Sequence, residues 1–111
     1  MRGLTIVVAG PDPDRLRAAL TMACAAAALG GRARVYLHEA AVGLLRQNAT
    51  APAGLPDLTE LRAIAADSGV ELIACQTGLA LAGLSADGQK VAAGGLIDLL
   101  ATLQSDRLVT L

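Results

Sequence analysis

Short apolar runs that alternate with helical patterns are the strongest constraint on how this chain folds. The first run, from Leu4 to Ala9, is nearly continuous, contains β-branched residues and ends at Gly10-Pro11. An apolar run without polar alternation is typical of a strand that is covered on both faces, as in a parallel sheet. The alternation therefore predicts a three-layer α/β fold with a mainly parallel sheet of about five strands. The predicted strands are Leu4–Ala9, Arg34–Leu37, Val70–Ala74, Lys90–Ala92 and Arg107–Leu111.

Helix signals fill the intervals between these runs. Asp12 is a capping residue, Pro13 suits the first helical position, and Gly30-Gly31 ends that helix. Asp57 followed by Glu60 has the spacing of a capping box. Further along, the pattern predicts a helix over Ala40–Arg46, a turn at Ser85–Gly88 and a helix that begins at Gly94-Gly95. The predicted buried faces are Leu16, Leu20, Ala23, Cys24 and Ala27; Leu58, Leu61, Ile64 and Ala65; and Leu96, Leu99, Leu100 and Leu103.

The composition bounds the size and the assembly of the fold. With 111 residues the chain is predicted to form a single domain, residues 1–111, and Gln47–Pro56 is predicted to be a surface loop within it. Hydrophobic residues make up 54% of the chain, although Tyr36 is the only aromatic residue. So many apolar side chains are difficult to bury in a short monomer, and we therefore expect a homo-oligomer.

Charge and hydropathy argue against two classes of partner. Nine basic and ten acidic residues nearly cancel, and the chain lacks both a basic stripe and a set of aromatic residues on which bases could stack. We therefore expect no nucleic-acid binding. The longest apolar run, Met22–Leu29, is too short to cross a membrane, and no signal-peptide pattern is present. We expect a cytoplasmic protein without a membrane partner.

Common phosphate-binding and metal-binding motifs are absent from the sequence. Neither G-x-G-x-x-G nor the P-loop pattern occurs, and Asp12 and Asp14 put negative charge where a phosphate would need a positive helix end. Cys24 and Cys75 form neither a C-x-x-C pair nor the ligand set of a zinc site. Cys24 lies on the apolar stripe of the first helix and is interpreted as a small buried hydrophobic residue.

Cys75 differs from Cys24 because it lies between a strand and a helix. It follows the predicted third strand at the carboxyl edge of the sheet, where ligands bind in parallel α/β folds. Gln76 and Thr77 open the short helix that follows, and Thr77 is the predicted cap. The free N–H groups of a helix start favour thiolate over thiol. The residues by themselves leave open whether Cys75 is reactive or only buried.

His38 is the only histidine, and its place at the end of the second strand makes it a candidate base for Cys75. If the first strand lies between the second and the third, the two strand ends are about 9–10 Å apart, which is two strand spacings. His38 is therefore interpreted as a surface residue beside Glu39. A Cys/His hydrolase is not favoured, because no third orienting group is evident.

Four segments of the chain share features with a known family, and they are Val70–Cys75, Leu81–Gly83, Gly94–Leu100 and Ser105–Leu111. Together they resemble the DsrE/TusD-like (DsrE/DsrF-like) family of sulfur-relay proteins. The resemblance implies a flavodoxin-like, DsrE-like subunit that assembles into homotrimers or homohexamers. It also implies that Cys75 carries sulfur as a persulfide and passes it to a partner protein. Ala82 stands where many relatives have a basic residue.

The leading hypothesis is a sulfur-relay protein, a possible sulfurtransferase. In it Cys75 accepts sulfane sulfur from a donor protein and hands it to an acceptor protein. His38, Gln76 and Thr77 are possible supporting residues, and no metal or organic cofactor is required. The alternative is a structural or regulatory oligomeric subunit of the same fold in which Cys75 is inert.

Overall fold

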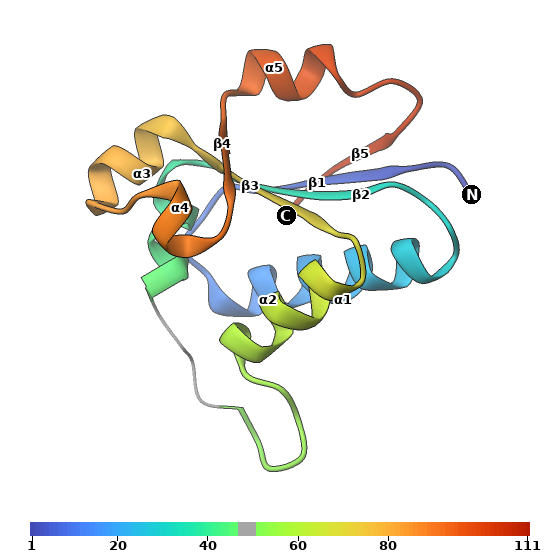
Figure 1. Cartoon of the computed structure of the whole chain (residues 1–111), viewed down its shortest axis with the longest axis horizontal. Helices are drawn as coiled ribbons and strands as arrows, with labels where there is room; N and C mark the ends of the chain where they lie inside the picture. Colours follow the sequence, from blue (N-terminus) through green and yellow to red (C-terminus); the bar gives the residue numbers. More distant parts are fainter. Residues whose placement is uncertain (47–50) are drawn as a thin grey trace.

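The computed structural model describes residues 1–46 and 51–111, and its centre is a parallel sheet with the strand order β4-β3-β2-β1-β5 (Figure 1). The strands are β1 (Leu4–Val8), β2 (Ala33–Leu37), β3 (Glu71–Cys75), β4 (Ala92–Gly94) and β5 (Arg107–Thr110). All four pairings are parallel, so the predicted α/β fold with a parallel sheet is confirmed. Residues 47–50 of the predicted loop Gln47–Pro56 lie outside the described residues, and residues 51–56 contain neither helix nor strand.

Helices cover both faces of the sheet. α1 (Pro13–Ala28) and α2 (Leu58–Asp67) lie on one face, and α5 (Leu96–Ala101) lies on the other (Figure 1). The chain moves in one direction from β1 through β2 and β3 to β4, and then returns to the far side of β1 as β5. Because crossovers between parallel strands are right-handed, this reversal puts α5 on the face opposite α1 and α2.

The strand order differs from the arrangement considered for His38. β2 lies between β1 and β3, so the second and third strands are direct neighbours. Their register pairs Leu37 with Ala74, and the residues that follow, His38 and Cys75, therefore lie at adjacent strand ends. The predicted separation of two strand spacings between His38 and Cys75 is therefore wrong. The apolar pattern does not encode strand order, which depends on the side of β1 to which each crossover packs.

The core lies between the sheet and the pair of helices α1 and α2. The helix starts are those predicted: Asp12 accepts a hydrogen bond from the N–H of Asp14 at 2.9 Å, and Asp57 and Glu60 form a capping box. These caps satisfy N–H groups that have no partner within the helix. The predicted core residues that are buried are Leu16, Leu20, Ala23, Leu58, Leu61, Ala65 and Leu99.

Other residues predicted for the core are not buried. Ile64 is 47% exposed, because α2 contacts the core through a narrower stripe than the periodicity suggests. α5 has only six residues and buries Leu99 alone, so Leu96 and Leu100 are exposed. Cys24 is half-buried at the margin of the core. Burial raises the pKa of its thiol, and a hydrogen bond with Ser68 opposes that shift.

Several short elements depart from the prediction in type or position. The helix predicted over Ala40–Arg46 is present as a 3-10 helix, η1 (Glu39–Arg46), and Ala86–Gln89 forms a short helix, α4, where a turn was expected. β4 begins at Ala92, two residues later than predicted, because Lys90 ends α4 in a left-handed conformation with φ of 57°. α3 (Gln76–Ala82) follows β3 without an intervening loop.

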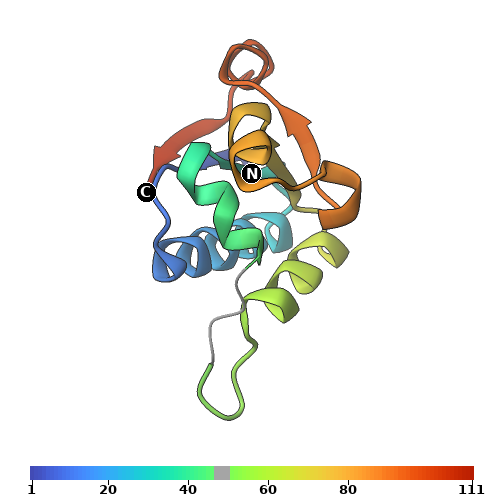
Figure 2. The ribbon, with the colours of Figure 1, turned by 90° about the vertical axis from the view of Figure 1, so that its left-hand side faces the viewer.

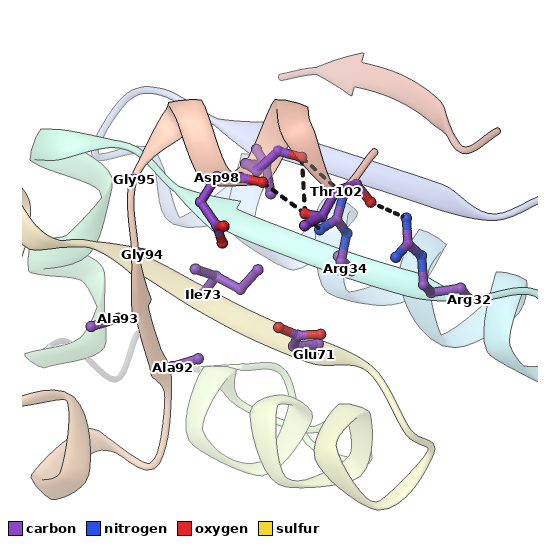
Figure 3. A pocket seen from close by; sticks show the side chains of 11 residues that line it. Arg32, Arg34, Glu71, Ile73, Ala92, Ala93, Gly94, Gly95, Asp98 and Thr102 are labelled. Atoms are coloured by element: carbon purple, nitrogen blue, oxygen red, sulfur yellow. Dashed lines mark hydrogen bonds between the residues drawn. The ribbon is translucent and has the colours of Figure 1, made fainter. Parts of the chain in front are cut away.

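A buried ionic cluster joins the two ends of the chain to the middle of the sheet. Oδ2 of Asp106 accepts hydrogen bonds from Thr5 Oγ1 and Arg32 Nε, both at 2.9 Å. Arg34 donates from Nε to Thr5 Oγ1 at 3.0 Å and from Nη1 to Thr102 Oγ1 at 2.8 Å. Figure 3 shows Arg34 of β2, and Arg32 just before this strand, reaching toward Thr102 at the end of α5. The cluster therefore holds β5 beside β1 and anchors α5 over the sheet.

The charge of Asp106 is stabilised by this environment. Burial alone would raise the pKa of its carboxyl, but hydrogen bonds from Arg32 and Thr5 and the positive charges of Arg32 and Arg34 lower it below the ordinary value. The packing is close enough to require glycine at position 3, where a Cβ would overlap with Oδ1 of Asp106. Removing the carboxylate would leave a buried guanidinium without its counterion.

Replacing Asp106 with Asn is expected to lower the free energy of unfolding at pH 7 by about 3 kcal/mol, because one partner of a buried ion pair is lost. The folded pKa of Asp106 is depressed, so its contribution is complete above the unfolded pKa of about 3.9 and is lost as the pH falls through the folded pKa. Urea unfolding at pH 7 and pH 3 measures both effects. The exposed Asp67→Asn is the control, and an Asp106→Asn penalty that did not shrink at low pH would contradict this account.

Candidate functional site

Cys75 ends β3 and is itself the N-cap of α3, with an extended backbone (φ −68°, ψ 143°). Its Sγ accepts a hydrogen bond from the N–H of Gly78 at 3.1 Å and a second one from the N–H of Glu39 at 3.0 Å. The prediction that Thr77 caps this helix is therefore wrong. The sulfur takes that role because the helix begins directly at Gln76, which leaves the N–H of Gly78 facing Cys75.

The second donor comes from a different part of the chain, because η1 packs closely against α3. Figure 2 shows these two short helices side by side at one edge of the sheet. Gly78 makes the contact possible: a Cβ there would lie 2.6 Å from the carbonyl oxygen of Glu39 and would overlap with Val42. A glycine in α3 is thus the reason that backbone from after β2 can reach the sulfur at the end of β3.

The sulfur lies beside a small hollow of about 180 Å³. Cys75 is 4% exposed, and the exposed residues Gln76 and Thr77 lie on the same hollow. The structure therefore brings all four predicted site residues to one place. The lining residues are Tyr36, His38, Glu39, Cys75, Gln76, Thr77, Gly94, Gly95 and Leu96.

His38 is both a neighbour of Glu39 and part of this hollow. Its Nε2 lies 3.5 Å from Oε1 of Glu39, as expected for a surface histidine beside that residue. Its ring stacks on Tyr36 with ring centroids 6.3 Å apart. Its Nδ1 is buried without a hydrogen-bond partner among the described residues. This nitrogen is enclosed by protein, and its bonding capacity is unused.

Tyr36 lines the same hollow and was not among the predicted site residues. The pKa of Tyr36 is raised to about 12, chiefly by burial. The negative charge of Cys75, a hydrogen bond with Cys75 and the negative charge of Glu39 act in the same direction. The hydroxyl therefore keeps its proton at neutral pH and is able to donate a hydrogen bond. A period-two pattern along β2 places Tyr36 and His38 on the same face, which is the signal that could have identified it.

Ala82 is not basic, but the basic side chain of Arg46 lies near the same end of α3. Ala82 ends α3, and Gly83 follows in a left-handed conformation with φ of 66°. Nη2 of Arg46, at the end of η1, lies 3.7 Å from where a Cβ on Gly83 would be. A cation from η1 is therefore near the C-terminal end of α3, where it is favoured by the helix dipole.

A second hollow, of about 270 Å³, shares Gly94 and Gly95 with the first. The carboxylates of Glu71 and Asp98 point into it beside Ile73, and Arg34 lies behind them (Figure 3). The donors of Arg34 are largely engaged by the Asp106 cluster and by the carbonyl of Leu99 at 3.3 Å. This hollow therefore combines exposed acidic groups with a guanidinium that has a structural role.

Two further features concern the described residues only. Within residues 1–46 and 51–111, no group of three or more His, Cys, Asp or Glu side chains is placed to hold a metal ion. None of the helices in that part of the chain is long and apolar enough to cross a membrane. Cys24 does not line the Cys75 hollow.

The fold and the site define a small parallel α/β protein with a hydrogen-bonded thiol at the carboxyl edge of its sheet. The model of the DsrE/DsrF-like family matches residues 2–111, and the chain belongs to that family. The solved structure of the ychN protein from E. coli is similar in fold, with a TM-score of 0.72, 23% sequence identity and coverage of 100% of both chains. No curated protein sequence matches the chain.

Replacing Gly78 with Ala is expected to destabilise the protein by about 1–3 kcal/mol, because the added methyl group forces η1 away from α3. Urea unfolding measures the change. Gly43→Ala is the matched control in η1, where a Cβ would meet nothing within 4 Å, and its effect is expected to stay within about 0.5 kcal/mol. Equal effects of the two substitutions would show that the contact at Gly78 is not close.

Proposed function

We propose that this protein is a sulfur carrier in which Cys75 holds sulfane sulfur as a persulfide and passes it to a partner protein. The observation that carries the proposal is the convergence of two N–H donors, from Gly78 and Glu39, on one sulfur, with Tyr36 beside it on the same hollow. Donors fixed before the reaction stabilise negative charge on a nucleophile and on its product. Membership of the DsrE/DsrF-like family supports the sulfur-relay setting.

The transfer is an exchange at sulfur without net oxidation or reduction. The Cys75 thiolate attacks the outer sulfur of a donor persulfide, and a new S–S bond forms. The donor's S–S bond breaks, and its electron pair leaves with the donor thiolate, which takes up a proton. In the second half, an acceptor thiolate attacks the outer sulfur on Cys75, and Cys75 departs again as a thiolate.

The surrounding residues have distinct roles in this proposal. The two N–H groups and the Tyr36 hydroxyl stabilise the charged sulfur, and His38 lies on the wall of the hollow beside Glu39. Gln76 and Thr77 form the open side of the hollow, where the donor approaches. The N–H donors come from Gly78 and Glu39, whereas the sequence pointed to those near Gln76 and Thr77.

We place this carrier in the cytoplasm, where cysteines remain reduced.

Incubation with a sulfane-sulfur donor tests the proposal directly. Wild-type protein is expected to gain roughly 32 Da, one sulfur atom, on Cys75, and Cys75→Ser is expected to gain nothing. Intact-mass spectrometry, followed by peptide mapping, measures the adduct. Cys24→Ser is the matched control and should load like wild type. If Cys75→Ser still gained the sulfur and Cys24→Ser did not, the carrier would be Cys24 and the proposal would be refuted.

One observation favours a second function, a structural or regulatory subunit with an inert thiol. Cys75 is only 4% exposed, so a bulky donor reaches its sulfur only through the small hollow beside it. In such a subunit the sulfur serves as the cap of α3 and nothing more. The same mass measurement separates the two functions, because an inert subunit gains no sulfur on either cysteine.

Replacing Tyr36 with Phe is expected to slow sulfur loading of Cys75 by about tenfold while the fold is retained. The change removes the hydroxyl that, in this proposal, donates a hydrogen bond to the sulfur, worth on the order of 1 kcal/mol, and keeps the buried ring. Time-resolved intact-mass measurements give the rate, and circular dichroism checks the fold. If Tyr36→Phe loaded sulfur at the wild-type rate throughout pH 6–9, Tyr36 would have no role in the mechanism.

We further propose that the chain assembles as a homo-oligomer, a homotrimer or homohexamer, through the face of α5. Ile97 is 88% exposed and Leu100 53% exposed, and Leu96 and Leu108 on the same side of the molecule are exposed as well. Apolar groups gathered in this way are typical of a surface that is covered in the assembly.

Replacing both Ile97 and Leu100 with Lys is expected to convert the oligomer to monomers, because the covered face would then carry charge. Sedimentation velocity measures the mass. Leu29→Lys, at the far end of α1 and 69% exposed in the chain, is the control that should keep the wild-type mass. A wild-type protein that sediments as a monomer at micromolar concentration would refute the assembly.

A further inference from the structure

A second cavity, larger than the hollow at Cys75, lies apart from it on the other face of the sheet. It has a volume of about 420 Å³ and lies between α2, the outer end of η1, β3 and α4. It shares no lining residue with the hollow at Cys75. Its volume falls within the range of small-molecule sites, roughly 300–1,000 Å³.

The walls of this cavity combine apolar side chains with positive charge. Leu45, Val70 and Leu72 supply the apolar part, together with alanines of α2. Arg62 and Lys90 are the charged residues that line it, and no Asp or Glu is among the lining residues. An apolar wall with cations and without acids favours an anionic ligand that also has an apolar body.

Arg62 is held in place but is not neutralised. Nη1 donates to the carbonyl of Leu45 at 3.3 Å and Nη2 to the carbonyl of Gln89 at 2.9 Å, so the guanidinium bridges η1 and α4. Its Nε is buried without a hydrogen-bond partner among the described residues. Burial lowers the pKa of Arg62, and no acidic side chain within residues 1–46 and 51–111 opposes that shift. A half-buried cation of this kind is stabilised by an anion that enters from outside.

Lys90 brings a second charge to the same place. It directly follows Gln89, whose carbonyl binds Arg62, and its left-handed backbone ends α4 at the mouth of the cavity. Lys90 is exposed and has no ion pair in the described part of the chain. The two cations together match a carboxylate, whose charge would be shared between a fixed guanidinium and a mobile ammonium.

We propose that this cavity binds a small carboxylate with an apolar chain, its carboxylate at Arg62 and Lys90 and its chain against Leu45, Val70 and Leu72. Binding here would join η1 to α4, and η1 carries the N–H of Glu39 that bonds to Cys75. The site itself stands independently of sulfur transfer.

Titration of the full chain with octanoate, followed by amide chemical shifts, tests this site. Saturable shifts are expected at Ala65, Leu72 and Lys90, and octanol, which has the same chain without the charge, is expected to bind at least about tenfold more weakly. Inorganic phosphate, which has the charge without the chain, is also expected to bind more weakly. Octanol or phosphate binding as tightly as octanoate would overturn the proposal, as would shifts centred on Ile97 and Leu100.

Two variants locate the charge. Lys90→Met, at an exposed position that should not affect folding, is expected to weaken octanoate binding about tenfold. Arg62→Met is expected to weaken it at least as much, while Arg15→Met, which changes an exposed arginine of α1, should bind like wild type. Unchanged affinity in Lys90→Met would refute the carboxylate position even where Arg62→Met fails to fold. Lys90→Met should still load sulfur on Cys75, so failure of this site is distinguishable from failure of the carrier function.

Discussion

The carboxylate of Asp106 is the interaction on which most of the structure depends. It accepts a hydrogen bond from Thr5, 101 positions away in the chain, and binds the guanidinium of Arg32. Charges buried in this way are tolerated only when each has a partner, and here Arg34, 4% exposed, completes the set. The cluster places β5 next to β1, so the last strand of the chain joins the sheet beside the first.

The same cluster acts at a distance on the candidate site. Arg34 donates to Thr102 and to the carbonyl of Leu99, which fixes the position of α5 over the sheet. α5 follows Gly94 and Gly95, the residues that close one side of the hollow at Cys75. The other side is formed by η1, which can approach α3 because Gly78 has no side chain. The sulfur is therefore surrounded by elements that are held in place from elsewhere in the fold.

The sequence predicted the architecture well and the site in part. The apolar runs and the caps at Asp12 and Asp57 are local signals, and the corresponding strands and helices are present. Cys75 was identified because a strand end followed by a helix start is also a local pattern. Tyr36 was not identified, since its relation to the sulfur requires β2 and β3 to be neighbours. The exposure of Ile64 shows a second limit: periodicity gives a face but not how much of that face a neighbour covers.

By itself, the sequence determined that the chain forms a parallel α/β sheet with a cysteine at its carboxyl edge. It could do so because helix caps, β-branched runs and glycine stops act over a few residues. Only the tertiary structure decided the strand order, the placement of His38 beside Cys75, and the convergence of the N–H groups of Glu39 and Gly78 on its sulfur. The bond from Glu39 to Cys75 joins residues 36 positions apart, and the bond from Thr5 to Asp106 joins residues 101 positions apart. Such relations exist only when helices pack on chosen sides of the sheet and buried charges find their partners.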